Sequence, residues 1–205
     1  MKLHLDNETF EELIQVTGMH FGIPELAVRK DYFITILLKR LSNSEYKNTV
    51  VFKGGTSLSK CYPGSIERFS EDIDLTYIPC ESESNKQIDK TLKKIEAVLT
   101  CETRWEKINE EHSQRNKSAR VYFEKDLYSG TPIKLEIGSS VRPEPYGLRK
   151  MTSLIGEYLY SNSMEDVARE YSLESFRLNV LDITRTFIDK VMAVKRHAIT
   201  GTLSQ

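Results

Sequence analysis

The stretch VFKGGTSLSKCYPGSIERFSEDIDLTYI, residues 51–78, decides the fold of this chain. It begins with an apolar run that stops at Gly54 and Gly55, which predicts a buried strand, a tight turn and then a short helix. Its last residues alternate between apolar and polar, which predicts a second strand. The glycine turn and the acidic pair Asp72 and Asp74 are therefore expected on one rim of a sheet.

Helical and strand periodicity continue on both sides of this stretch. The order of the elements predicts an α+β fold with a small mixed β-sheet flanked by helices. In the helix at 24–41, the apolar face is expected to be buried and basic residues such as Arg29 and Lys30 to be exposed. Helices are predicted at 7–18, 24–41, 56–61, 84–99, 164–171 and 183–199, and strands at 49–52, 73–78, 121–123, 133–137 and 176–180.

No flexible linker divides the chain, so residues 1–205 are expected to form a single domain. Its expected parts are a helical N-terminal part at 1–45, a core sheet at 46–140 and a mostly helical C-terminal part at 141–205. The 29 basic and 30 acidic residues leave a net charge of -1, so the overall charge does not indicate a nucleic-acid binder, and any such binding must come from a local patch.

The cysteines and the hydropathy pattern bear on the compartment. Cys61, Cys80 and Cys101 are about twenty residues apart without a CxxC pair, which argues against a zinc site or a disulfide framework and predicts reduced thiols. No apolar run is long enough for a signal peptide or a membrane span. A cytoplasmic location without membrane association is therefore expected.

Three carboxylates are candidates for binding a divalent metal. Asp72 and Asp74 are separated by one residue on a predicted strand, so both point to the same face while Ile73 points into the core. Mg²⁺, or Mn²⁺ in its place, takes hard oxygen ligands of this kind together with water and phosphates. Glu136, in an apolar strand, is the candidate third ligand, although an ordinary ion pair with Lys134 would also explain it.

The glycine turn is a candidate phosphate site. Glycines let the backbone approach a phosphate closely, and the N–H groups of Gly55, Thr56 and Ser57 at a helix start favour an anion. With the acidic pair beside it, the turn predicts that a nucleoside triphosphate binds here.

Two motifs, KGGTSL at 53–58 and RFSEDIDL at 68–75, closely resemble the signature of AbiEii/AbiGii-type nucleotidyltransferases of the DNA polymerase β superfamily. These are toxins of bacterial toxin–antitoxin and abortive-infection systems. Further matches are KLEI at 134–137 and RTFIDK at 185–190, so the resemblance spans most of residues 51–199. It implies a polymerase-β-like nucleotidyltransferase fold.

The resemblance also implies roles for individual residues, a metal cofactor and partners. The protein would transfer a nucleoside monophosphate from an NTP to an acceptor hydroxyl, the 3′ end of a tRNA being one candidate, and a cognate antitoxin would bind it. Basic residues that could hold an RNA backbone are Arg142, Arg149, Lys150, Arg185, Lys195 and Arg196. The implied site has Lys53, Gly54, Gly55, Thr56, Ser57, Arg68 and Ser70 on the nucleotide, Asp72, Asp74 and Glu136 on Mg²⁺ or Mn²⁺, and Lys190 beside the triphosphate.

Two other interpretations stay open at this point. A non-catalytic module that binds a nucleotide or the antitoxin would keep NTP affinity without turnover. A metal-dependent nuclease would use the same carboxylates but gives no reason for the glycine turn. Members of the family tend to continue beyond the final helix with another helical segment, so this chain is expected to be either truncated or a short variant.

Overall fold

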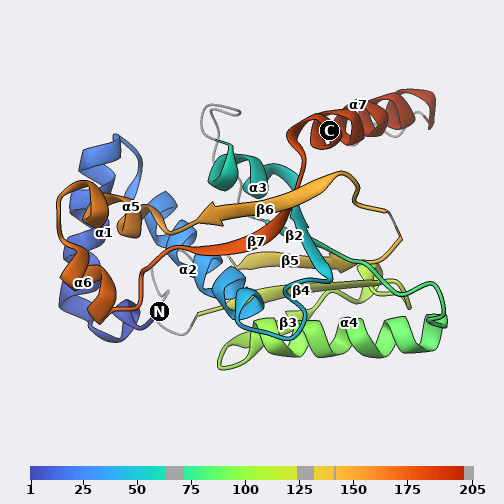
Figure 1. Cartoon of the computed structure of the whole chain (residues 1–205), viewed down its shortest axis with the longest axis horizontal. Coiled ribbons are helices and arrows are strands. Elements are labelled where there is room, and N and C mark those ends of the chain that lie inside the picture. Colours follow the sequence, from blue (N-terminus) through green and yellow to red (C-terminus); the bar gives the residue numbers. More distant parts are fainter. Residues whose placement is uncertain (63–71, 124–131, 141, 201–205) are drawn as a thin grey trace.

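One seven-stranded mixed sheet runs through the middle of the protein, with helices on both faces (Figure 1). The computed structural model describes residues 1–62, 72–123, 132–140 and 142–200. In this described part the strand order is β3-β4-β5-β2-β1-β7-β6. Strands β1 and β2 are antiparallel, whereas β1 with β7 and β2 with β5 are parallel, so the sheet is mixed.

The elements follow one another in an alternating order along the chain. The strands are β1 (Val50–Lys53), β2 (Ile73–Tyr77), β3 (Arg104–Lys107), β4 (Asn116–Tyr122), β5 (Ile133–Gly138), β6 (Tyr146–Met151) and β7 (Phe176–Leu181). The helices are η1 (Leu3–Leu5), α1 (Asn7–Phe21), α2 (Glu25–Ser42), α3 (Gly54–Cys61), α4 (Asn85–Thr100), η2 (Asn109–Glu111), α5 (Leu154–Ser161), α6 (Glu165–Glu170) and α7 (Ile183–Thr200).

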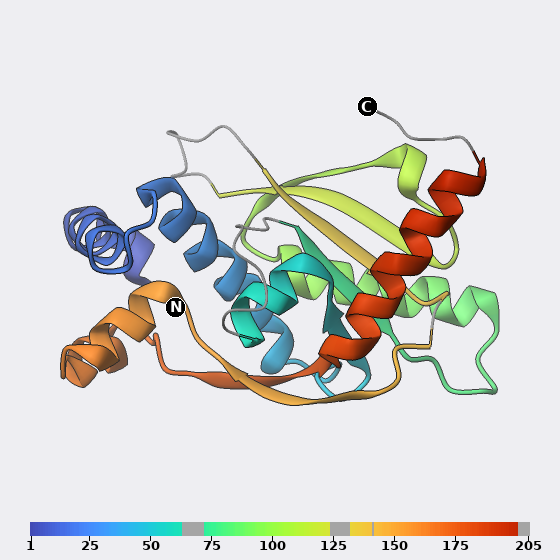
Figure 2. The ribbon, with the colours of Figure 1, turned by 90° about the horizontal axis from the view of Figure 1, so that it is seen from above.

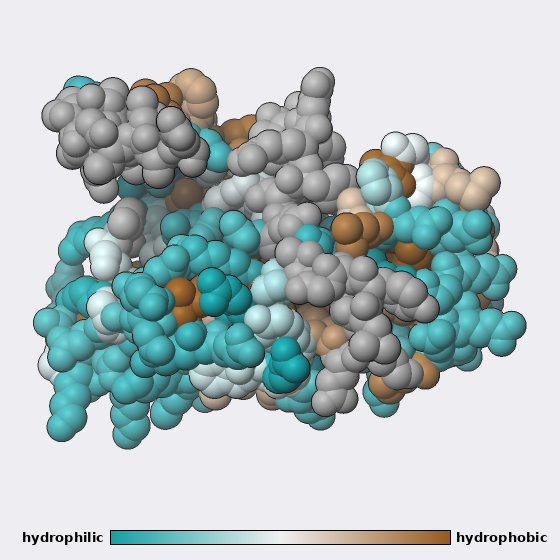
Figure 3. Space-filling view, turned by 180° about the vertical axis from the view of Figure 1, so that it is seen from behind, coloured by the Kyte–Doolittle hydropathy of each residue, from teal (hydrophilic) through white to brown (hydrophobic). Residues whose placement is uncertain are grey.

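Helices α2 and α4 cover one face of the sheet and enclose the main core with it (Figure 1). Helix α4 is amphipathic, and a capping box of Ser84 and Gln87 fixes its start. Figure 3 shows the molecule from behind, where most of the coloured surface is hydrophilic. Core residues of α4 are Ile88, Leu92, Ile95 and Leu99, and the strands add Phe52, Ile73, Leu75, Ile133, Leu135 and Ile137.

The prediction that basic residues of α2 are exposed is wrong for Arg29 and Lys30. Arg29 is 7% and Lys30 5% exposed, because α1 and α5 pack on sides of α2 that the sheet and α4 leave open. Arg29 forms an ion pair with Glu11, and its guanidinium lies 5.2 Å from the ring centre of Phe10. Both partners belong to α1, and they stabilise the buried charge of Arg29.

The other face of the sheet carries α3 and α7 (Figures 1 and 2). Helix α3 contacts β1, β2, β6 and β7. Helix α7 leaves the end of β7 and crosses above the sheet, and it is anchored at its first turns, where Thr186 is buried. Further along α7, Phe187 and Val194 are 66% and 69% exposed.

The architecture predicted from the sequence, a mixed sheet flanked by helices, is confirmed, and so are the strands β1, β2, β5 and β7. Strands β3 and β6 and helix α5 were not predicted. Residues after 140 contribute β6 and β7 to the sheet, so the sheet extends into the part expected to be mostly helical. All three cysteines are free, and no helix within the described ranges has the length and apolar character needed to span a bilayer.

Candidate active site

Sheet register brings the predicted residues of three strands into one row. Asp74 of β2 lies opposite Lys53 of the antiparallel β1 and opposite Glu136 of the parallel β5. Paired residues of neighbouring strands point to the same face. Ile73 and Leu75 on either side of Asp74 lie in the core, so Asp74 and Glu136 point to the opposite face, below α3 and α7.

The glycine turn lies directly against this row. Gly54 has a φ of +82°, in the left-handed region that favours glycine. A Cβ atom at this position would lie 2.2 Å from Oδ2 of Asp74, so any other residue would displace this carboxylate. The turn between β1 and α3 therefore needs glycine for two reasons, and it places the start of α3 beside the Asp74 carboxylate.

The hydroxyl groups of Thr56 and Ser57 bond within the protein. Thr56 Oγ1 donates to the backbone oxygen of Asp72 (2.5 Å), and Ser57 Oγ donates to that of Gly54 (2.9 Å). Both residues are buried. Their side chains thus hold the turn to the start of β2, and the groups available to an anion are the backbone N–H groups of the first turn of α3.

The carboxylates repel one another. Burial raises the pKa of Asp74 above its usual range, and the charges of Glu136 and Asp72 raise it further. Lys53 and Lys134 oppose this rise. Adjacent negative charges of this kind are costly to a fold, and they are typical of sites that bind a cation or catalyse a reaction.

Lys134 is the nearest cation to Glu136. Its ammonium lies 2.6 Å from Glu136 Oε1 and 3.0 Å from Glu111 Oε1, and the hydrogen bond to Glu136 raises the pKa of Lys134. The ion pair between Lys134 and Glu136, which the sequence offered as another explanation of Glu136, is thus present. Glu111 is a member of this cluster that the sequence did not indicate, because it lies in a short 3₁₀ turn between β3 and β4.

The residue types fit Mg²⁺ or Mn²⁺, since all three candidates are carboxylates and Asp74 lies in register with Glu136. In the ranges that the structure describes, no group of three or more His, Cys, Asp or Glu side chains is arranged to hold a metal ion. Mg²⁺ commonly takes one or two carboxylates and completes its shell with water and phosphates, so a prearranged third ligand is not required.

Comparison with known proteins identifies the family. The family model "Nucleotidyl transferase AbiEii toxin, Type IV TA system" matches residues 36–201. The chain belongs to this family. The resemblance inferred from the two motifs is thereby confirmed.

Two solved structures that are similar to this chain are longer than it. MenT4, a nucleotidyltransferase toxin from Mycobacterium tuberculosis H37Rv, matches with a TM-score of 0.59 and 21% identity over 87% of this chain and 57% of MenT4. JHP933 from Helicobacter pylori matches with a TM-score of 0.49 and 17% identity, over 82% of this chain and 56% of JHP933. The chain thus spans a little more than half of each. None of the curated proteins compared matches it.

For the other residues implied by the AbiEii resemblance, the described part of the structure shows no contact with the row of Lys53, Asp74 and Glu136. Arg68 and Ser70 lie outside the described residues. Lys190 is exposed on α7, the helix that crosses above the carboxylate face (Figure 2), and no described contact links it to the carboxylates. Arg185 bonds to Asp189 Oδ1 (2.9 Å) and to the backbone oxygen of Glu144 (2.8 Å), so it anchors the start of α7.

Proposed function

We propose that this protein transfers a nucleoside monophosphate from an NTP to an acceptor hydroxyl, with release of pyrophosphate, as the toxin of a type IV toxin–antitoxin system. One observation carries the proposal: a glycine turn at a helix start lies against Asp74, and Asp74 lies in register with Glu136. A phosphate cradle beside paired carboxylates is what in-line transfer at a triphosphate requires.

In this proposal the start of α3 holds the triphosphate. The backbone N–H groups at Gly54, Gly55, Thr56 and Ser57 would bind phosphate oxygens, because the first N–H groups of a helix have no partner inside it. Lys53, in register with Asp74, would add a positive charge. Arg68, Ser70 and Lys190 are assigned to the nucleotide by the family resemblance alone.

Asp72, Asp74 and Glu136 would hold Mg²⁺ or Mn²⁺. When bound, the metal would supply Lewis-acid stabilisation of the attacking and leaving oxygens. Lys134 would have to leave Glu136 for this carboxylate to contribute, and Glu111 on its other side offers it an alternative partner.

The acceptor and the partner protein follow from the family. We propose an RNA acceptor, with the 3′ end of a tRNA as its first candidate, and a cognate antitoxin as the protein partner. The six basic residues named from the sequence remain candidates for the RNA backbone. One of them, Arg149, lies with its guanidinium 5.0 Å from the ring centre of Tyr62, just after α3.

The experiment supplies the chain with each of the four α-labelled NTPs, Mg²⁺ and total tRNA. We expect label in RNA and release of pyrophosphate, both abolished by a chelator and by Asp74→Asn. Wild-type protein that transfers no label to any RNA or protein overturns the proposal. Calorimetric NTP binding without turnover would then indicate the binding module, and RNA shortening without NTP would indicate the nuclease.

A further inference from the structure

Lys134 of β5 lies between two carboxylates, and only one of them belongs to the candidate metal site. Its ammonium is 2.6 Å from Glu136 Oε1 and 3.0 Å from Glu111 Oε1. All three side chains are partly exposed, so water can enter as they move. An ammonium carries three donors, and Lys134 can therefore give up its contact with Glu136 and keep a charged partner in Glu111.

The contact with Glu136 is one that a divalent cation would also need. In the transfer function proposed above, Glu136 binds the metal together with Asp74, with which it lies in register. A metal ion on Glu136 would have a second positive charge, that of Lys134, against the same carboxylate, and like charges at such short range repel. Lys134 and the metal ion are thus competitors for Glu136.

Glu111 is fixed beside Lys134 by contacts of its own segment with β4. Its backbone oxygen accepts a hydrogen bond from Asn116 Nδ2 (2.7 Å), and the side chain of Ser118 bonds to its carboxylate. The next residue, His112, has its ring Nε2 3.0 Å from the backbone oxygen of Ser118. The carboxylate of Glu111 is therefore held in place, whereas Lys134 has a long side chain with four rotatable carbons.

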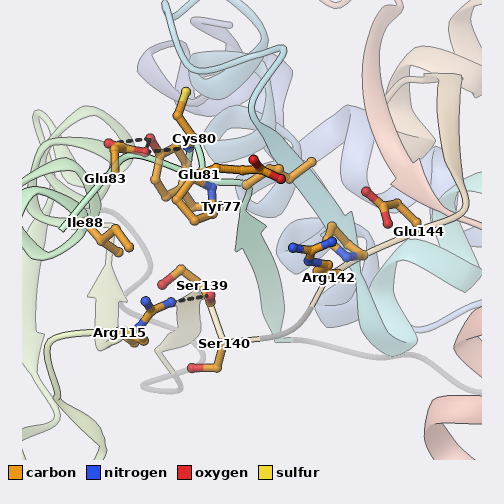
Figure 4. Close-up of a pocket in the computed structure, with 13 residues that line it drawn as sticks. Tyr77, Cys80, Glu81, Glu83, Ile88, Arg115, Ser139, Ser140, Arg142 and Glu144 are labelled. Atoms are coloured by element: carbon orange, nitrogen blue, oxygen red, sulfur yellow. Dashed lines mark hydrogen bonds between the residues drawn. The ribbon is translucent and has the colours of Figure 1, made fainter. Parts of the chain in front are cut away.

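The same segment is tied to the end of β5. The Ser139 N–H donates to the backbone oxygen of Arg115 (3.0 Å), and Arg115 Nη1 donates to the backbone oxygen of Ser139 (3.3 Å), as Figure 4 shows. Ser118 is paired with Glu136 in the register of β4 and β5. Because these contacts fix the two carboxylates relative to each other, Lys134 can change partner by rotation of its own side-chain bonds.

We propose that Lys134 regulates the metal site by competing with the divalent cation for Glu136, and that Glu111 is the positioning residue that takes Lys134 when the cation binds. The proposal rests on the metal site of the transfer function above. Before the cation binds, Lys134 offsets the repulsion between Glu136 and Asp74. Afterwards Glu111 keeps the ammonium away from the cation, so the affinity for the cation depends on both residues.

The test measures Mn²⁺ affinity by calorimetry, without NTP or RNA, in a double-variant cycle. Lys134→Met removes the competing ammonium, so we expect Mn²⁺ affinity to rise about tenfold. Glu111→Gln removes the alternative partner of Lys134, so we expect Mn²⁺ affinity to fall about tenfold. In the Lys134→Met background, Glu111→Gln should change the affinity less than about twofold, because Glu111 acts through Lys134.

Two matched variants remove the same charges from nearby positions. Glu110→Gln removes an exposed carboxylate from the residue next to Glu111. Arg120→Met removes an exposed cation from the residue of β4 that is paired with Lys134. Each should change Mn²⁺ affinity less than about twofold, since water and salt screen exposed charges.

Thermal unfolding gives a second measurement that needs no activity. With a chelator present, Lys134→Met should unfold at a lower temperature than wild type, because Glu111 and Glu136 lose their shared cation. Mn²⁺ should then raise the unfolding temperature of Lys134→Met by more than that of wild type, because a ligand that binds the folded state more tightly stabilises it more.

The outcomes separate this proposal from the transfer function. A fall in Mn²⁺ affinity in Lys134→Met overturns the competition even where transfer activity is intact. So does an effect of Glu111→Gln that is equal with and without Lys134, and so does a wild-type protein that binds no Mn²⁺. The expected cycle in a protein that transfers no label supports the competition and refutes only the transfer function.

Discussion

Two groups of charged side chains lie on opposite faces of the sheet and differ in how their charges are balanced. Below α4, the buried ammonium of Lys117 donates to Asp89 Oδ1 (2.8 Å), and hydrogen bonds from Lys117 and Lys93 lower the pKa of Asp89 to about 2. On the other face, burial and the charges of Glu136 and Asp72 raise the pKa of Asp74. The first group stabilises the fold through its charges, whereas the second works against the fold.

The difference separates a structural ion pair from a functional site. A carboxylate whose pKa is lowered by a cationic partner contributes to the stability of the fold. A carboxylate whose pKa is raised by burial and by other carboxylates destabilises the fold, and a bound cation would offset this cost. Changes in the two groups should therefore act on different measurements.

The largest expected effect is on transfer by Asp74→Asn. Loss of one ligand should lower the rate by at least about 10²-fold, the range seen when one charge-stabilising group is removed. The unfolding temperature at neutral pH should rise, because the substitution removes a charge that the fold disfavours. Labelled-NTP transfer and thermal unfolding measure the two effects.

Asp89→Asn is the matched control for that change. It should leave the transfer rate within about twofold and lower the unfolding temperature, since Asp89 belongs to the balanced pair. A lower unfolding temperature for both variants would contradict the distinction between the two groups.

Lys117→Met should have the largest effect on stability. The lysine is 2% exposed, and removing it takes a buried donor away from Asp89 Oδ1 and from the backbone oxygens of Ser113 and Asn116. We expect a loss of about 2 to 4 kcal/mol in the free energy of unfolding, measured with urea.

Lys93→Met is the control for Lys117→Met, because Lys93 pairs with the same carboxylate at 2.7 Å from an exposed position. Its loss should cost less than about 1 kcal/mol. Equal losses for the two lysines would show that burial does not set the strength of this pair.

Gly54→Ala should act on both fold and site. The φ of +82° costs an alanine about 1 to 2 kcal/mol, and its Cβ would push the Asp74 carboxylate away. Mn²⁺ affinity, measured by calorimetry, should fall with it. At Gly22, whose φ is +66° with nothing within 4 Å of a Cβ, the same substitution should cost similar stability and leave Mn²⁺ affinity unchanged.

The smallest expected effects appear on mild acidification. The raised pKa of Asp74 means that it takes up its proton above its ordinary value of 3.8, so Mn²⁺ affinity should fall as pH falls through that region. The pKa of Asp89 lies below its unfolded value, so its stabilisation is complete above about pH 4 and is lost as pH falls toward about 2.

The loss of Mn²⁺ affinity and the loss of stabilisation by Asp89 should therefore occur at different pH values. Between neutral pH and about pH 4, the stability difference between wild type and Lys117→Met should stay constant while Mn²⁺ affinity declines. A stability difference that shrinks together with Mn²⁺ affinity would place Asp89 and Asp74 in the same class.

The sequence alone determined the local features of the site. Alternation along residues 73–77 decided that Asp74 points away from the core, because side chains of a strand alternate between its faces. The two glycines marked the turn for a steric reason that is also local. The family followed from these motifs, and the family model confirms it.

Only the tertiary structure decided which distant groups meet. The register of β2 with β5 brings Glu136 beside Asp74, and the fold places Glu111 on Lys134, which no periodicity could indicate. Strands β3 and β6 are largely exposed and carry charged residues, so they lack the apolar alternation that reveals a strand. Burial of Arg29 likewise depends on Glu11 and on the packing of α1, because a charge is tolerated in a core only where other elements supply its partners.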